Sequence, residues 1–128
     1  MIVLSENEMI QFGKEISQKN RKILLYWDLW AWKTHFTKWV ALWIGINPDF
    51  IKSPTYTYIQ IYENKLLHID MYRLNTENDF IEKWILDQIN EYENIVIERP
   101  KFESLYTDTS FLKIEIIKIK ENTRELIF

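Results

Sequence analysis

Apolar residues recur with a changing period along the chain, and the first two patterns predict a helix followed by a strand. Met9, Phe12 and Ile16 lie at helical spacing. Ser5 precedes them, with Glu8 three residues later, which is the spacing of a helix capping box. We expect this helix to run to about residue 19. The apolar run at residues 23–26 then predicts a short buried strand.

A second helix is predicted to begin around Lys33. Its inward stripe would be Phe36, Val40 and Ile44, and the sequence Asn-Pro-Asp at residues 47–49 would end it. Residues 55–62 then alternate as a strand, residues 63–65 read as a turn, and residues 66–70 return as a second strand. This segment predicts an antiparallel hairpin.

The C-terminal half repeats the alternation of helix and strand. Residues 76–90 fit one helix, capped by Thr76 with Asp79 three residues on, and residues 94–98 form an apolar strand that ends in a carboxylate. Residues 111–120 alternate as a late strand, with which residues 124–128 would pair. The whole pattern predicts a single α/β domain over residues 1–128, with three layers and a mixed sheet that includes the hairpin.

Composition and charge narrow the classes of function. The chain has 128 residues, a net charge of −3, a sequence pI near 5.4 and no cysteine. A net negative charge argues against broad adhesion to nucleic acid or membrane, so we expect any RNA contact to be indirect. The absence of cysteine excludes disulfides and thiolate metal sites. No apolar run reaches the length of a membrane span, and we expect a cytoplasmic protein.

Glycine and tryptophan occur in unusual numbers. The chain contains 2 glycines and 6 tryptophans, where average usage would give about nine glycines. Residues 27–34 read Trp-Asp-Leu-Trp-Ala-Trp-Lys-Thr. With glycine in place of tryptophan, this string matches the phosphate-binding pattern G-x-x-x-x-G-K-[ST], and it lies between a predicted strand and a predicted helix, as the pattern requires.

The written tryptophans conflict with such a loop for a steric reason. A phosphate-binding loop requires positive φ at some positions and close approach of its backbone to an anion at others, and glycine meets both requirements at the lowest cost. Two explanations compete. The chain is a relative that has lost nucleotide binding, or its gene uses UGA codons for glycine that have been translated as tryptophan. We favour the second explanation.

The loop pattern assigns definite chemistry to two residues. The Lys33 ammonium would reach the β- and γ-phosphates, and the Thr34 hydroxyl would ligate Mg²⁺. Asp70 and Glu98 each end an apolar strand, where an α/β sheet presents groups to its ligand. Either carboxylate could hold Mg²⁺ or orient the attacking water. We therefore predict Lys33, Asp70 and Glu98 as catalytic residues, and Thr34 and Glu98 as metal ligands.

Other polar and aromatic residues are weaker candidates. His68 precedes Asp70 by two residues, but the chain has only one other histidine. We therefore interpret His68 as an orienting or packing residue and not as a metal ligand. Four tyrosines in or near the hairpin are more typical of sheet surface or core than of base stacking. They are Tyr56, Tyr58, Tyr62 and Tyr72.

Four motifs in order resemble the TsaE family, the small P-loop ATPases of bacterial tRNA threonylcarbamoyladenosine synthesis. Residues 27–36 are similar to the family's Gly-Asp-Leu-Gly-Ala-Gly-Lys-Thr-Thr-Phe. The other three motifs are Ser-Pro-Thr-Tyr-Thr at residues 53–57, His-Ile-Asp-Met-Tyr-Arg-Leu at 68–74, and Ile-Glu-Arg-Pro at 97–100. The resemblance covers nearly the whole chain and implies a P-loop NTPase-like fold.

The remaining tryptophans and both glycines also match family positions. Trp39, Trp43 and Trp84 lie at glycine sites of the family, the last between a helix and its continuation, while Gly13 and Gly45 are retained. The chain departs from the family at His35, which replaces the second threonine after the lysine, and at Arg99, which replaces the usual tryptophan after the glutamate.

By resemblance, the protein would bind and hydrolyse ATP with Mg²⁺. It would act with TsaB and TsaD in threonylcarbamoyladenosine formation at position 37 of tRNAs that read ANN codons, and it would contact tRNA only through that complex. The segment at residues 53–57 would lie near the nucleotide and sense its state. The residues expected to bind the nucleotide are Trp27, Asp28, Leu29, Trp30, Ala31, Trp32, Lys33, Thr34 and His35.

Two other functions remain open on the sequence. A chain with genuine tryptophans in its loop would be a scaffold that keeps the fold and the partner contacts but binds no nucleotide. A different small P-loop enzyme, such as a kinase, would transfer phosphate to an acceptor, although no lid or acceptor-binding segment is evident in so short a chain.

Overall fold

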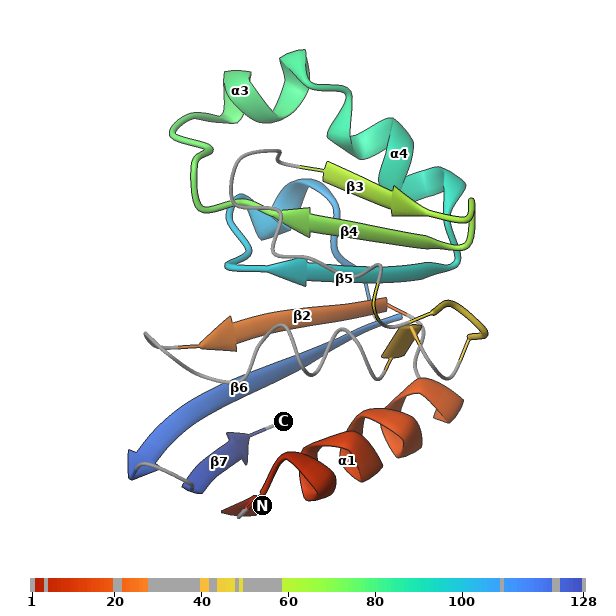
Figure 1. Cartoon of the computed structure of the whole chain (residues 1–128). Helices are drawn as coiled ribbons and strands as arrows, with labels where there is room; N and C mark the ends of the chain where they lie inside the picture. Colours follow the sequence, from red (N-terminus) through yellow and green to blue (C-terminus); the bar gives the residue numbers. More distant parts are fainter. Residues whose placement is uncertain are drawn as a thin grey trace.

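The computed structural model describes residues 2–3, 5–19, 22–27, 40–41, 44–47, 49, 59–108, 110–120 and 123–127. These residues form a seven-stranded sheet with the strand order β1-β7-β6-β2-β5-β4-β3 (Figure 1). The strands are β1 (Ile2–Val3), β2 (Lys22–Trp27), β3 (Ile59–Tyr62), β4 (Leu66–Asp70), β5 (Asn94–Glu98), β6 (Phe111–Lys120) and β7 (Thr123–Ile127).

The centre of the sheet is parallel and its edges are antiparallel. β2 pairs in parallel with both β5 and β6, and β5 pairs in parallel with β4. β3 joins β4 as the expected hairpin, while β7 and β1 extend the other edge in antiparallel pairs. The central strands are apolar along nearly their whole length because helices cover both of their faces. The predicted mixed sheet is therefore confirmed.

Helices on the two faces complete a three-layer architecture. α1 (Glu6–Lys19) packs on one face, where Met9, Phe12 and Ile16 join a core with Ile23 and Leu25 of β2. α3 (Glu77–Glu82), α4 (Ile85–Glu91) and the 3₁₀ helix η2 (Glu103–Leu105) lie on the other side. Their core contains Leu24, the residue between those two β2 side chains. Successive side chains of β2 thus enter different cores, as the pleat of a strand requires.

The predicted second helix is described only near its C-terminal end. Val40 and Ala41 are helical and lie in the same core as α1. Gly45 follows at φ +87°, and the Ile46 amide donates to the Ala41 carbonyl at 2.9 Å. This is the six-to-one hydrogen bond of a Schellman ending, which requires a left-handed residue at the glycine position. The helix therefore ends at Gly45, slightly before residues 47–49.

The hairpin turn and the cap of α1 follow the sequence expectations. Glu63 and Asn64 both have positive φ, and the Lys65 amide donates to the Tyr62 carbonyl at 2.9 Å, as in a type I′ turn. The Glu8 amide donates to the Ser5 hydroxyl at 3.2 Å at the start of α1. Of the first predicted hairpin strand, residues 55–62, the structure describes residues 59–62 as β3. Residues 55–58 lie outside the described residues.

Three features differ from the sequence expectations. The single helix predicted over residues 76–90 is wrong, because α3 and α4 are separate helices. β1 and η2 were not predicted, since segments of two and three residues are too short to show a period.

The assignment of residues 1–128 to one domain stays a prediction. Among the described residues, no helix is long and apolar enough to cross a membrane.

The break between α3 and α4 lies at Trp84. Its backbone is left-handed, with φ 57° and ψ 31°, and its side chain is 70% exposed. A Cβ atom in this conformation crowds the neighbouring carbonyl oxygen at a cost of about 1–2 kcal/mol. A largely exposed indole does little to offset that cost. The backbone at position 84 therefore suits glycine better than tryptophan.

We expect Trp84→Gly to be more stable than Trp84→Ala by about 1 kcal/mol in urea unfolding. Both variants lose the indole, so the difference between them isolates the cost of a Cβ atom at positive φ. Equal stability of the two variants would mean that the left-handed backbone at position 84 carries no such cost.

The capping box of α3 gives the chain a pH-dependent contact. The Asp79 carboxylate accepts from the amides of Asn75 and Thr76 at 3.0 and 3.2 Å, and the Thr76 hydroxyl accepts from the Asp79 amide at 3.1 Å. The two backbone hydrogen bonds lower the pKa of Asp79 below its ordinary value. Because the pKa of Asp79 is lower in the folded state than in the unfolded state, its negative charge stabilises the fold at pH values above the unfolded-state pKa.

The contribution of Asp79 should be lost as the pH falls through its lowered pKa, which lies below the ordinary value for an aspartate. We expect Asp79→Asn to be less stable than the parent in urea at neutral pH, and the gap to narrow steadily as the pH is lowered into the acid range. An Asp87→Asn control, in the exposed first turn of α4, reports the effect of removing one surface charge. A gap for Asp79→Asn that persists unchanged in acid would contradict the role of its charge.

Candidate functional site

Two buried carboxylates lie side by side at the ends of β4 and β5. Asp70 is the last residue of β4 and Glu98 the last residue of β5, and the two are partners in the parallel register. Glu98 is also the register partner of Leu25 on β2. Their exposed fractions are 5% and 0%. β2, β5 and β4 are neighbouring parallel strands, and both predicted carboxylates lie at their carboxyl ends. Residues 27–34 begin at the same end of β2.

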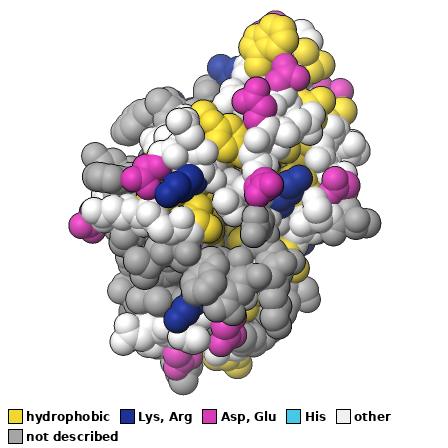
Figure 2. Space-filling view, turned by 90° about the vertical axis from the view of Figure 1, so that its right-hand side faces the viewer, with side chains coloured by type: hydrophobic (Ala, Val, Ile, Leu, Met, Phe, Trp, Pro, Cys, Tyr) yellow, Lys and Arg dark blue, Asp and Glu magenta, His cyan; other side chains and the backbone are white. Residues whose placement is uncertain are grey.

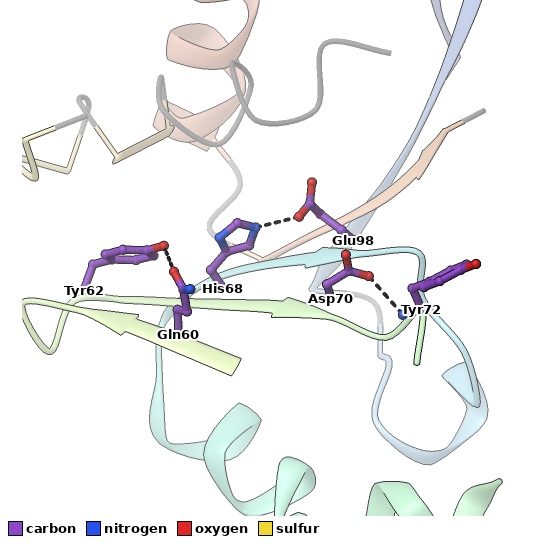
Figure 3. A network of polar contacts seen from close by, with 6 residues as sticks. All are labelled: Gln60, Tyr62, His68, Asp70, Tyr72 and Glu98. Carbon is purple, nitrogen blue, oxygen red and sulfur yellow. Dashed lines mark hydrogen bonds and ion pairs between the residues drawn. The ribbon is translucent and has the colours of Figure 1, made fainter. Parts of the chain in front are cut away.

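The carboxylates share the face of the sheet that carries α1 and the described helical residues Val40 and Ala41. Leu66 and Val96 belong to that core, and His68, Asp70 and Glu98 follow them at intervals of two residues. In Figure 3 all three side chains point away from α3 and α4. The described end of the helix predicted to follow residues 27–34, Val40 and Ala41, therefore lies on the same face as the carboxylates.

Backbone groups fix the position of Asp70. Its Oδ1 atom accepts from the Tyr72 amide at 2.9 Å (Figure 3). The next residue, Met71, donates its amide to the Glu98 carbonyl at 3.1 Å. The second bond continues the pairing of β4 with β5 past the last strand residue. The first places the Asp70 carboxylate against the turn that follows β4.

The two oxygens of Glu98 have different surroundings. Oε2 lies 2.9 Å from Nε2 of His68, and both side chains are fully buried. Oε1 is also buried and has no hydrogen-bond partner among the described residues. A buried carboxylate oxygen is costly unless it is paired or coordinates a cation. Carboxylate oxygens are the ligands that Mg²⁺ prefers, so Glu98 fits the predicted role of metal ligand.

The described residues supply only part of a metal site. No three His, Cys, Asp or Glu side chains within the described ranges are grouped closely enough to hold a metal ion. Mg²⁺ commonly takes one or two carboxylates and completes its shell with water and phosphate oxygens. Such a sparse protein ligand set is therefore compatible with a magnesium nucleotide.

Lys101 forms hydrogen bonds with the backbone of the chain segment that follows Asp70. Its Nζ atom donates to the carbonyl of Tyr72 at 3.0 Å and to that of Leu74 at 2.6 Å. Arg99 lies between Glu98 and this lysine, with φ 51°, and its guanidinium stacks over the Tyr72 ring at 4.4 Å. The turns after β4 and β5 are thus joined by a charged hydrogen-bond donor and a cation–π contact.

Two of these contacts lie outside the catalytic set predicted from the sequence. His68 is buried and packed among its neighbours, but its specific partner Glu98 was missed. The available signal was the period of two that puts His68, Asp70 and Glu98 on one face. Lys101 was missed altogether, because a lone lysine in a loop carries no pattern. Tyr62 is buried, as expected for a core tyrosine, and Tyr72 is exposed.

Most of the predicted loop falls outside the described residues. Trp27 ends β2, while residues 28–39 lie outside the described ranges, as do residues 53–57. These include Asp28, Leu29, Trp30, Ala31, Trp32, Lys33, Thr34 and His35. The roles assigned to them therefore stay predictions. The same holds for Tyr56 and Tyr58.

An apolar groove lies on the face of the sheet opposite to the carboxylates. It has a volume of about 610 Å³ between α3, α4 and η2, and its lining includes Phe80, Ile81, Trp84 and Leu105. In Figure 2 hydrophobic side chains gather toward the top of the view, where Figure 1 has α3 and α4.

The phenols of Tyr26 and Tyr106 stay protonated at neutral pH. Burial and the Glu103 carboxylate raise the pKa of each of them above its ordinary value.

Comparison with protein families gives a match over nearly the whole chain. The family model for threonylcarbamoyl adenosine biosynthesis protein TsaE matches residues 3–126. The chain is 32% identical over 104 residues to the tRNA threonylcarbamoyladenosine biosynthesis protein TsaE of Borreliella burgdorferi, a match that covers 76% of this chain and 74% of that protein.

A second relative is the TsaE protein of Aquifex aeolicus, to which the chain is 37% identical over 81 residues. That match covers 58% of this chain and 61% of the Aquifex protein, so it spans less than two thirds of that relative.

Among solved structures, the crystal structure of Bacillus subtilis YdiB is similar, with a TM-score of 0.70 and 22% identity. The superposition covers 98% of this chain and 80% of YdiB. This likeness confirms the predicted fold class.

Proposed function

The chain belongs to the TsaE family of threonylcarbamoyladenosine biosynthesis proteins, and from that membership we propose that it binds ATP with Mg²⁺ and hydrolyses it. It would serve as an accessory protein with TsaB and TsaD in the modification of position 37 of tRNAs reading ANN codons. Its contact with tRNA would be indirect, which suits a chain with a net charge of −3.

The pair of carboxylates at the ends of β4 and β5 is the observation that carries this proposal. Asp70 and Glu98 are in register beside β2, the strand that leads into residues 27–34. Both lie on the face that carries the helix expected to follow those residues. Open α/β sheets bind their ligands outside the carboxyl ends of their strands, where these two residues lie.

Each residue of the proposed site has one task. Lys33 neutralises charge on the β- and γ-phosphates, and Thr34 contributes a hydroxyl ligand for Mg²⁺. Glu98 contributes the buried Oε1 atom as a ligand. Asp70 orients the attacking water or adds a second carboxylate to the metal. Mg²⁺, when bound, neutralises the charge that develops on the phosphate oxygens.

The proposal includes glycine at the six tryptophan positions of the native protein, through UGA codons that mean glycine. The left-handed backbone and 70% exposure of Trp84 support this reading at a position far from the loop in sequence. If the tryptophans are genuine, the protein is instead a scaffold that keeps the fold and the partner contacts without a nucleotide.

The mass of one peptide from the native source separates these two functions. Trypsin cleaves after Lys22 and Lys33 and releases residues 23–33, which contain three of the six positions in question. We expect glycine masses at positions 27, 30 and 32. Tryptophan masses at these positions would reject the ATPase and favour the scaffold.

The role of Glu98 is testable in the full chain with glycine at all six positions, assayed with TsaB and TsaD. We expect Glu98→Gln to lower the rate of Mg²⁺-dependent ATP hydrolysis at least about tenfold, because the amide is a poorer ligand for a hard cation. Glu91→Gln makes the same chemical change at an exposed residue of α4 and should leave the rate unaltered. Equal rates for the two variants would remove Glu98 from the site.

A further inference from the structure

The contact between His68 and Glu98 joins two buried polar side chains from neighbouring strands. Nε2 of His68 and Oε2 of Glu98 are 2.9 Å apart, and neither side chain has measurable exposure (Figure 3). An ionised carboxylate can only accept a hydrogen bond, so in this pair Nε2 would carry the hydrogen and donate it, while Nδ1 of His68 is buried without a hydrogen-bond partner among the described residues. One oxygen of Glu98 is therefore committed to His68, and the other is left for a different partner.

The sheet register determines which carboxylate His68 can reach. His68 is the register partner of Val96, and Glu98 lies two residues further along β5 on the same face. Asp70 is also two residues from His68, but along β4 itself. The Asp70 carboxylate is held by the Tyr72 amide. The imidazole therefore fixes Glu98, while the backbone fixes Asp70.

Packing from β3 limits the rotation of the imidazole. The Tyr62 ring lies against His68 with 6.3 Å between ring centroids and an angle of 35° between the planes. Tyr62 is itself buried and donates its hydroxyl hydrogen bond to Gln60 (Figure 3). Because this packing already confines the imidazole of His68, the imidazole loses little rotational entropy when it forms the hydrogen bond with Glu98.

We propose that His68 is a positioning residue, which donates a hydrogen bond from Nε2 to Oε2 of Glu98 and thereby aims Oε1 at Mg²⁺. This inference rests on the proposed function, because it takes Glu98 as a metal ligand. Hydrogen bonds from neighbouring residues orient metal ligands, and their loss commonly lowers metal affinity about 10- to 100-fold. The two residues form one unit across β4 and β5.

The hydrogen bond can be tested on the written sequence without nucleotide. Long-range ¹⁵N–¹H correlation spectra of the histidine rings give the tautomer of each imidazole, and a His35→Gln variant assigns the two histidines. We expect His68 to carry its hydrogen on Nε2, and Glu98→Gln to shift that signal. A hydrogen on Nδ1 alone, or a signal that is unmoved in Glu98→Gln, would overturn the proposal.

The aiming of Oε1 is tested by the Mg²⁺ requirement of ATP binding in the full chain with glycine at all six positions. ATP is present throughout, Mg²⁺ is titrated in, and the rise in melting temperature gives a Mg²⁺ midpoint. We expect His68→Phe, which keeps a ring of similar size but cannot donate, to raise the midpoint at least about tenfold. His68→Gln, whose amide nitrogen can donate, should recover most of that loss.

Tyr62→Phe is the matched control, since it removes the hydroxyl that donates to Gln60 but keeps the ring that packs against His68 and leaves the hydrogen bond between His68 and Glu98 intact. Its Mg²⁺ midpoint should equal that of the parent. Equal midpoints for the parent and His68→Phe would overturn the positioning role, as would a His68→Gln variant no better than His68→Phe. If His68→Phe does not fold, the comparison of His68→Gln with the parent decides, with a rise of more than about tenfold counting against the proposal.

Failure of the proposed function gives a different result. A glycine-loop chain that shows no stabilisation by ATP at any Mg²⁺ concentration would reject nucleotide binding itself. A normal midpoint in Glu98→Gln would reject Glu98 as the ligand and, with it, the role of His68. An altered midpoint in Glu98→Gln beside a normal one in His68→Phe rejects His68 alone.

Discussion

The parallel register of β2, β5 and β4 is the constraint on which the rest of the site depends. It sets Leu25, Glu98 and Asp70 in one row, although Leu25 is far from the other two in the sequence. A slip of β4 by one residue would move His68 and Asp70 to the face opposite Glu98 and drive apolar residues such as Ile69 out of their core. Because β4 is buried along its whole length, such a slip would disrupt both layers at once. Packing of the two cores therefore holds the carboxylates in place.

Burial of charge at this edge of the sheet is explained better by ligand binding than by stability. Removing a carboxylate from water is costly, and a buried ion pair rarely stabilises a fold more than apolar residues would. Glu98 is fully buried with one oxygen held by His68, while Asp70 relies on a backbone amide. Lys101 stabilises the turn after β4 by donating hydrogen bonds to two of its backbone carbonyls. The two acidic groups lie on one face of the sheet, as the proposed magnesium site needs.

Backbone conformation at two helix boundaries is adopted more easily by glycine than by other residues. Gly45 and Trp84 both have positive φ, and each stands at a helix boundary. Glycine adopts this conformation freely and tryptophan does so at a cost. The apolar groove beside α3 and α4 owes part of its wall to Trp84. Glycine at this position would remove that part of the wall, so the groove would be wider and shallower there.

Local periodicity in the sequence determined most of the elements: α1, the hairpin, the central strands and the acidic ends of β4 and β5. Turn chemistry at residues 47–49 also predicted the end of the second helix within a few residues of Gly45, where the structure has it. Periodicity missed the break at Trp84, because the apolar stripe of residues 76–90 continues through it and a left-handed residue leaves no trace in a period of 3.6, although the family resemblance places a glycine there between a helix and its continuation. The pairing of His68 with Glu98 and the contacts of Lys101 were decided by the tertiary structure alone. Residues about 30 positions apart meet only when strand order and register are set, and these depend on the burial of both faces of the sheet at once.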